Sequence, residues 1–215
     1  MVRINERLVN NEGMISNEYL WDLICKVKAV VEKLAVKLPY FEFIYIVFLL
    51  YSEDRDIVIF EVGLGGRLDA VNHLDADIFL LTSISRDHQE FLGNRYELIL
   101  REKLGVLRSE QNFYSSLELA YLRTKTAQFI ENYKNINWTD CFEAKITHKD
   151  DDFHTRNQKL VNLVLEKEFS MSLEIKSEFP GRILDIYDNK CYFMPSHNPD
   201  GLRNFIQLMQ REKYN

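Results

Sequence analysis

Apolar residues recur at helical spacing near the start of the chain. They follow Ser16, a residue type that favours a helix N-cap, so we predict a helix that ends before Pro39. Its apolar positions are Leu20, Leu23, Ile24, Val27, Val30, Val31 and Leu34. Residues 41–52 are almost all apolar, which predicts a second helix buried on most of its sides.

Two runs rich in β-branched and aromatic residues, 56–62 and 78–84, are typical of strands covered on both faces. Strands that alternate with helices predict an α/β fold, with a mostly parallel sheet flanked by helices and functional loops at the carboxyl ends of its strands. We expect further helices at 95–107, 115–133, 157–168 and 200–212, a strand near 141–146, and a hairpin formed by 182–187 and 190–193.

Composition excludes several classes of protein. The 27 Lys and Arg against 33 Asp and Glu give a net charge of −6, which opposes binding to nucleic acid. Three scattered cysteines suit neither a disulfide framework nor a CxxC metal site, and the charged first residues do not form a secretion signal. The longest apolar run is about half of the roughly 20 residues that span a membrane. We therefore expect a cytoplasmic protein with no membrane or nucleic-acid partner.

A glycine-rich segment, Glu61-Val-Gly-Leu-Gly-Gly-Arg-Leu-Asp69, follows the first predicted strand. Glycines let backbone approach a ligand, and a carboxylate beside them at a strand end suits a hard cation such as Mg²⁺. A dinucleotide fingerprint is disfavoured, because its third glycine would fall at Leu68. The alternative is an ordinary glycine-rich turn in which Glu61 pairs with Arg67.

The second predicted strand ends in Ser83-Ile-Ser-Arg-Asp-His88. A neutral imidazole at this position can bind a metal, and the neighbouring carboxylate can orient it. Taken alone, His88 also fits a loop histidine without a ligand. Because Glu61 and His88 end consecutive predicted strands, we expect both at one edge of the sheet, where a metal–phosphate site would lie.

Residues 56–107 resemble the folylpolyglutamate synthase and dihydrofolate synthase family of the Mur ligase superfamily. The resemblance rests on EVGLGGRLDAVN, on DH followed shortly by LG, and on EKLG. It extends to Tyr40-Phe-Glu42, to Phe179-Pro-Gly-Arg182 and to His197-Asn-Pro199. The family implies an incomplete central ATP-binding domain at 1–178 and the start of a truncated C-terminal ligase domain at 179–215.

The resemblance also implies roles for individual residues. Glu61, His88 and Lys103 would hold Mg²⁺, with His88 and Lys103 acting in catalysis and Lys103 carbamylated. Asn157, Arg182, His197 and Asn198 would bind ATP. The alternatives are an exposed helical lysine for Lys103, a surface arginine for Arg182, and an Asn-Pro turn for the His197 segment.

The family's reaction is ATP-dependent amide formation between glutamate and folate or dihydropteroate, through an acyl phosphate. This chain departs from the family in three ways: it contains no Gly-Lys-Ser or Gly-Lys-Thr P-loop sequence, Val71 replaces a threonine, and Met194 replaces an aspartate expected near the ATP ribose. The alternative function is an inactive remnant, or a nucleotide- or folate-binding scaffold that needs a partner fragment carrying the P-loop. We also expect an unpaired strand edge at 57–62, leading to low solubility or association.

Overall fold

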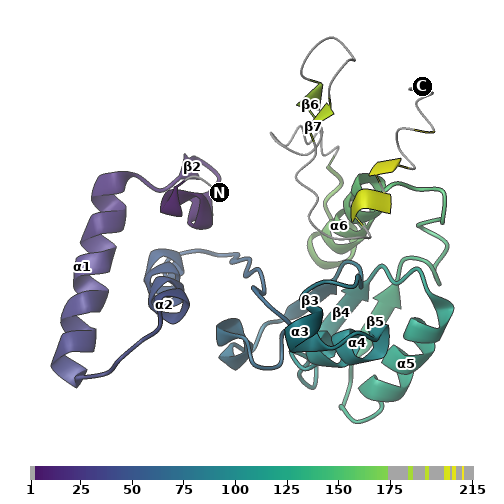
Figure 1. The fold of residues 1–215 in the computed structure, drawn as a ribbon, viewed down its shortest axis with the longest axis horizontal. Coiled ribbons are helices and arrows are strands. Elements are labelled where there is room, and N and C mark those ends of the chain that lie inside the picture. The colour runs from purple at the N-terminus through teal and green to yellow at the C-terminus, as the bar shows by residue number, and fades with distance from the viewer. Residues whose placement is uncertain are drawn as a thin grey trace. The chain divides into compact units, whose positions relative to one another are not determined.

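The computed structural model describes residues 3–173, 184–185, 192–193, 201–203, 205–206 and 210. The chain divides into two compact units (Figure 1). Unit 1 comprises Met1–Leu64 and Asp69–Leu74, and unit 2 comprises Gly65–Leu68 and Asp75–Asn215. The expected boundary between a domain at 1–178 and a second domain at 179–215 lies outside the described residues. This division of the chain therefore stays a prediction.

Unit 1 is built around two helices. α1 spans Asn17–Leu34, and its N-cap Ser16 accepts a hydrogen bond from the backbone N–H of Tyr19 (3.1 Å), as predicted. It ends at Ala35 in the left-handed conformation (φ 52°), ahead of Pro39. α2 spans Tyr40–Ser52, also as predicted. Before α1 lie a short 3₁₀ helix, η1 (Ile4–Arg7), and an antiparallel pair, β1 (Val9–Asn10) and β2 (Gly13–Met14).

The hydrophobic core of unit 1 lies where α1, α2 and the N-terminal residues meet. Leu8 and Val47 are completely buried there. Among the apolar positions predicted in α1, Leu20, Leu23 and Val27 are buried in this core, and Ile24 and Val31 pack against it. Val30 and Leu34 are exposed (55% and 64%), so the prediction is wrong at these two positions. The buried residues are Leu8, Ile15, Leu20, Leu23, Val27, Ile44, Val47 and Tyr51.

The predicted strand at 56–62 is wrong, because residues 57–62 have no regular secondary structure. A strand requires ladder hydrogen bonds to a neighbour, and no described residue pairs with this backbone. The side chains still alternate in exposure: Phe60 packs edge-on against Tyr45 and Phe48 of α2, whereas Ile59 is 84% exposed. The segment therefore has strand-like sequence without a partner strand. It leads to a second 3₁₀ helix, η2 (Ala70–His73).

Unit 2 contains a parallel three-stranded sheet in the order β3 (Ile78–Leu81), β4 (Asn112–Ser115) and β5 (Asn137–Asp140). Its helices are α3 (Gln89–Leu92), α4 (Tyr96–Leu104), α5 (Ala120–Ile130) and α6 (Phe153–Phe169). α6 lies on one face of the sheet, and α4 and α5 lie on the other (Figure 1). The predicted α/β fold class, a parallel sheet flanked by helices, is thereby confirmed.

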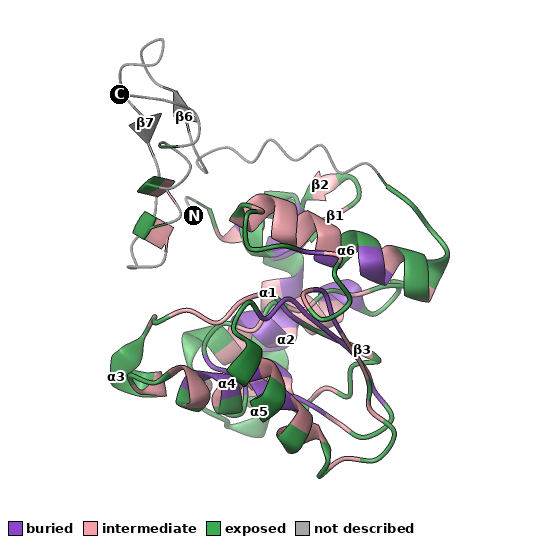
Figure 2. Ribbon diagram, turned by 90° about the vertical axis from the view of Figure 1, so that its right-hand side faces the viewer, coloured by how far each residue is buried: buried purple, intermediate pink, exposed green. Residues whose placement is uncertain are grey.

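Alternating side chains of these strands form the two layers of the unit 2 core. Phe113 stacks between Phe79 and Trp138, one residue from each strand, at ring-centroid distances of 5.1 and 5.9 Å. Tyr114, on the opposite face, packs with Leu160 and other apolar residues of α6. Figure 2 shows the burial of the sheet.

Several predicted boundaries differ from the structure. β3 is shorter than the run 78–84, and β4 occupies residues that were not predicted as a strand. β5 precedes the strand expected near 141–146, where the chain instead forms turns. The predicted hairpin is confirmed as β6 (Leu184–Asp185) paired antiparallel with β7 (Tyr192–Phe193). Within the described ranges, no helix is both long and apolar enough to cross a bilayer.

We expect the chain to associate through the 57–62 segment, and Ile59→Lys to reduce this association without lowering the melting temperature. A β-prone segment with an unpaired backbone is a template for pairing with another chain, and a lysine opposes such pairing. Sedimentation velocity measures the effect. The control is Leu68→Lys, which changes a side chain of similar exposure (80%) outside the segment. A monodisperse wild-type monomer would contradict the prediction.

Candidate functional site

The first half of the glycine-rich segment is folded by Asp69, in unit 1. One carboxylate oxygen of Asp69, Oδ2, accepts hydrogen bonds from the backbone N–H groups of Gly63 (3.1 Å) and Leu64 (3.0 Å). The other oxygen, Oδ1, accepts the N–H of Val71 (3.1 Å) and so caps η2. Gly63 also lies close to Phe41, because a Cβ at this position would be 3.1 Å from the end of its ring. Asp69 is therefore a structural residue of the motif, a role that its position alone does not reveal.

The second half of the segment packs against the C-terminal end of α4, in unit 2. The backbone N–H of Arg67 donates to the carbonyl oxygen of Glu102 (2.8 Å), and the Arg67 guanidinium pairs with the Glu102 carboxylate (3.0 Å). Gly66 has φ 152°, and a Cβ on it would lie 3.2 Å from the Cα of Lys103. Two sequence motifs, the glycine-rich segment and EKLG, are thus parts of one local structure.

Lys103 is half-buried beside this contact. Its burial lowers the pKa of the ammonium group, and the negative charge of Asp87 opposes that shift. The structure therefore differs from the exposed lysine that the helical alternative expects. It also places Lys103 within electrostatic reach of the loop that follows β3.

His88 ends that loop in a left-handed backbone conformation (φ 48°) and is the N-cap of α3. Its backbone N–H donates to Asp87 Oδ1 (2.8 Å), and its ring Nε2 lies 4.0 Å from the same oxygen. The imidazole is half-exposed. Asp87 thus lies next to His88 and acts electrostatically on Lys103, so unit 2 brings together an imidazole, a carboxylate and an amine. Sequence analysis identified Asp87 only as an orienting neighbour of His88.

Among the described residues, no group of three or more His, Cys, Asp or Glu side chains is placed to hold a metal ion. Glu61 is exposed and belongs to unit 1, whereas His88 and Lys103 belong to unit 2. The sequence analysis placed Glu61 at the sheet edge because it predicted a strand at 56–62, and that strand is not formed. Ligation of one ion by Glu61, His88 and Lys103 therefore stays a prediction.

The predicted nucleotide-binding residues are only partly visible. Asn157 lies near the start of α6 and is half-buried. Arg182, His197 and Asn198, and also Met194, lie outside the described residues. Their roles stay predictions.

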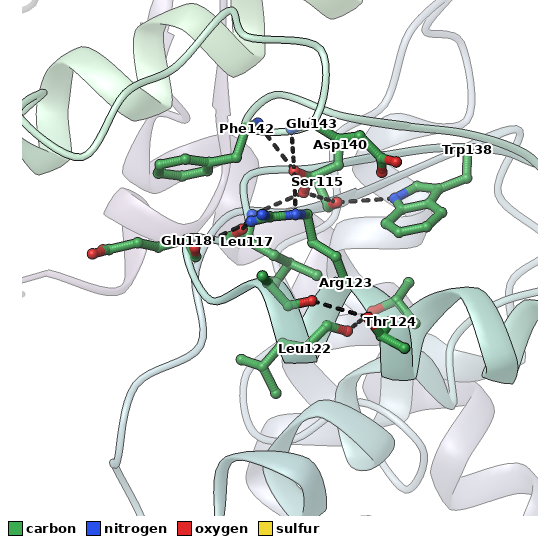
Figure 3. A network of polar contacts seen from close by, with 12 residues as sticks. Ser115, Leu117, Glu118, Leu122, Arg123, Thr124, Trp138, Asp140, Phe142 and Glu143 are labelled. Carbon is green, nitrogen blue, oxygen red and sulfur yellow. Dashed lines mark hydrogen bonds and ion pairs between the residues drawn. The ribbon is translucent and has the colours of Figure 1, made fainter.

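A further polar cluster, which sequence analysis missed, lies at the carboxyl ends of β4 and β5 (Figure 3). Asp140 is 3% exposed, and its Oδ2 accepts hydrogen bonds from Ser115 Oγ (2.6 Å) and the backbone N–H of Leu117 (2.9 Å). Its Oδ1 accepts the backbone N–H groups of Phe142 (3.0 Å) and Glu143 (3.2 Å). One buried carboxylate thus holds the loops that follow two neighbouring strands.

Comparisons with known proteins agree with the resemblance. No family model matches the chain. Dihydrofolate synthase/folylpolyglutamate synthase of Escherichia coli strain K12 is 49% identical over 78 residues, which are 35% of this chain and 18% of that protein. The protein of the same name from Bacillus subtilis strain 168 is 37% identical over 116 residues, covering 50% of this chain and 27% of that protein.

Solved structures are similar over nearly the whole chain. E. coli FolC in complex with DHPP and ADP has a TM-score of 0.80 and 25% identity, covering 100% of this chain and 57% of that chain. The apo form of L. casei FPGS has a TM-score of 0.80 and 21% identity, covering 98% and 62%. The resemblance to the folylpolyglutamate synthase and dihydrofolate synthase family is confirmed.

The chain spans only part of the length of the proteins to which it is similar. The matched segments span 17–36% of the curated relatives, and the chain covers 57–64% of the similar solved chains. Some of these solved proteins contain ligands. One is an FPGS–AMPPCP–folate complex, and another, a bifunctional folylpolyglutamate synthase/dihydrofolate synthase, has Mn, AMPPNP and L-glutamate bound.

Proposed function

We propose that this chain provides the nucleotide-binding part of an ATP-dependent, ADP-forming amide ligase of the folylpolyglutamate synthase and dihydrofolate synthase type. In the proposed reaction, a folate or dihydropteroate carboxylate takes the terminal phosphoryl group of ATP and releases ADP. The amino group of glutamate then attacks the acyl phosphate, forms the amide bond and releases phosphate. The substrates are small molecules, and ATP with Mg²⁺ is the proposed cofactor pair.

One observation carries the proposal: unit 2 joins three separate family motifs at one place. Gly66 and Arg67 pack on the helix end that holds Lys103, and the negative charge of Asp87, next to His88, opposes the lowering of the Lys103 pKa by burial. That loop follows the carboxyl end of a parallel strand, the edge at which α/β proteins bind ligands. The resemblance to known ligases is therefore expressed in the local three-dimensional structure as well as in the sequence.

Each predicted site residue has a proposed role. Mg²⁺, when bound, would neutralise charge that develops on the transferred phosphoryl group. Glu61 and His88 are its proposed ligands, and Lys103 would contribute as a carbamate, which converts an amine into an oxygen ligand. The proposed nucleotide contacts are Asn157, Arg182, His197 and Asn198.

Calorimetry and product release together test the proposal. We expect the purified chain to bind ATP in the presence of Mg²⁺, and to release ADP only when both glutamate and a folate substrate are present. ADP release that does not depend on glutamate would contradict amide ligation. Absence of both binding and release would contradict a nucleotide-binding role for the chain.

A second candidate function is a nucleotide- or folate-binding scaffold without turnover of its own. The observation that favours it is the absence of a Gly-Lys-Ser or Gly-Lys-Thr sequence in these 215 residues. A P-loop supplies backbone N–H groups and a lysine to the phosphates. Mg²⁺-dependent ATP binding without ADP release would select the scaffold, and restored release on addition of a P-loop fragment would identify the partner.

Glu61→Gln tests the metal assignment. We expect the variant to bind Mn²⁺ about tenfold more weakly in the presence of ATP, since an amide oxygen lacks the charge of a carboxylate ligand. The melting temperature should remain unchanged, because Glu61 is exposed. Electron paramagnetic resonance of free Mn²⁺ measures the affinity. Unchanged affinity together with a large loss of stability would assign Glu61 a structural role instead.

A further inference from the structure

The loops held by Asp140 form the contact surface for the N-terminal end of α6. Arg156, in the first turns of α6, pairs with the Glu118 carboxylate (2.6 Å) in the loop after β4. Its guanidinium also lies 5.3 Å from the centre of the Phe142 ring, in the loop after β5. Arg156 further donates to the carbonyl oxygen of Lys149 (2.7 Å). Since Asn157 is the next residue, its position depends on the two loops that Asp140 holds.

Arg123 reinforces the same loops from α5. It donates to the carbonyl oxygens of Leu117 and Glu118, and its Nε lies 3.9 Å from Asp140 Oδ1 (Figure 3). The buried carboxylate therefore has both a positive partner and hydrogen-bond donors, the conditions under which a charge persists away from water. Asp140 ties the loops together because its two carboxylate oxygens accept all of these hydrogen bonds at once.

We propose that Asp140 is a positioning residue for the nucleotide site: it fixes the loops after β4 and β5, and through Arg156 these loops set the location of Asn157. The inference rests on the proposed function, because it assumes that Asn157 contacts ATP. Asp140 does not contact ATP in this proposal, and it affects ATP binding only through the two loops. An Asp140 that contributed only stability would leave the nucleotide affinity of the folded protein unchanged.

Asp140→Asn tests this role with two measurements on the full chain. The amide has the same shape as the carboxylate, but it keeps only one acceptor oxygen and has an NH₂ group in place of the other. It therefore cannot accept hydrogen bonds from the loop after β4 and the loop after β5 at once. We expect ATP, titrated calorimetrically with Mg²⁺, to bind about tenfold more weakly, a loss of about 1.4 kcal/mol. We also expect hydrogen exchange at residues 153–158 to accelerate about tenfold, while exchange in β3 stays as in the wild type.

Glu168→Gln is the matched control, because Glu168 lies in α6 and its carboxylate, like that of Asp140, accepts hydrogen bonds from β4. Glu168 accepts hydrogen bonds from the Tyr114 hydroxyl and from the side-chain amide of Asn112 (3.0 Å), near the other end of α6. The control should lower stability while leaving ATP affinity and exchange at 153–158 unchanged. Equal effects of Glu168→Gln and Asp140→Asn would overturn the positioning role.

Glu118→Gln keeps the test decisive where Asp140→Asn does not fold. The Glu118 side chain is 43% exposed, so the variant removes the negative charge that pairs with Arg156 and leaves the core unchanged. We expect about threefold weaker ATP binding and faster exchange at 153–158. Wild-type affinity and exchange in a folded variant would overturn the proposal. If the wild-type chain binds no ATP, the proposed function fails, and the exchange measurement alone decides whether Asp140 holds the start of α6.

Discussion

Phe113→Ala is expected to lower the free energy of unfolding of unit 2 by about 3–5 kcal/mol, the cost of removing a large ring from a closed core. Phe113 is completely buried, and it stacks between Phe79 and Trp138, so it connects all three strands of the sheet. Because folded domains are stable by about 5–15 kcal/mol, the variant should lie near the limit of folding.

Urea unfolding followed by Trp138 fluorescence measures this loss. Trp21 lies in α1 of unit 1, so a Trp21→Phe background makes the signal specific to unit 2. Two controls are available: Phe113→Leu should cost about 1.5 kcal/mol, and Phe91→Ala, at a side chain 71% exposed, about 0.5 kcal/mol or less. A loss below about 1 kcal/mol for Phe113→Ala would show that the aromatic stack does not hold the sheet together.

Gly66→Ala is expected to lower stability by about 3 kcal/mol and to abolish metal-dependent nucleotide binding. At φ 152° an L side chain is strained, and its Cβ would lie 2.7 Å from Val106 Cγ2 and 2.9 Å from the Glu102 carbonyl oxygen. One of these neighbours is helix backbone, which cannot rotate away. The glycine-rich segment must therefore separate from α4, and the surroundings of Lys103 would change with it.

Gly93→Ala is the matched control in the same unit. Its φ is also positive (86°), but the closest contact of a new Cβ is the end of the flexible Leu98 side chain. We expect a loss of about 1.5 kcal/mol with ATP binding retained. Thermal unfolding and calorimetric titration measure the two effects. A Gly66→Ala variant as stable as Gly93→Ala, with normal ATP binding, would contradict the close packing of the motif on α4.

Helices and strands that are specified by neighbouring residues can be predicted from the sequence. α1 is a clear example, since Ser16 caps it and its apolar residues recur on one side. The parallel α/β class also follows from local pattern, because buried strands alternate with helices. Residues 57–62 show the limit of this approach: their composition favours a strand, but a strand exists only with a partner, and pairing is a property of the whole fold.

The candidate site shows the same limit. His88, Lys103 and the glycine-rich segment were identified from motifs, and their proximity in unit 2 is consistent with that identification. Asp140 was missed, because it and Ser115 are separated by 25 positions and meet only through the register of β4 and β5. The burial of Lys103 was also unpredicted from helical spacing, since the segment packed beside it comes from a distant part of the chain.

The central claim is that a metal–nucleotide complex binds at the edge of the sheet where the His88 loop meets Lys103. Proton nuclear magnetic resonance of the five histidine rings, during titration with Mn²⁺ and ATP, tests it most directly. We predict that substoichiometric Mn²⁺ with ATP broadens the ring signals of His88, assigned with His88→Asn, and that Glu61→Gln weakens this broadening. Signals of His88 that keep their linewidth while Mn²⁺ and ATP bind elsewhere would contradict the account.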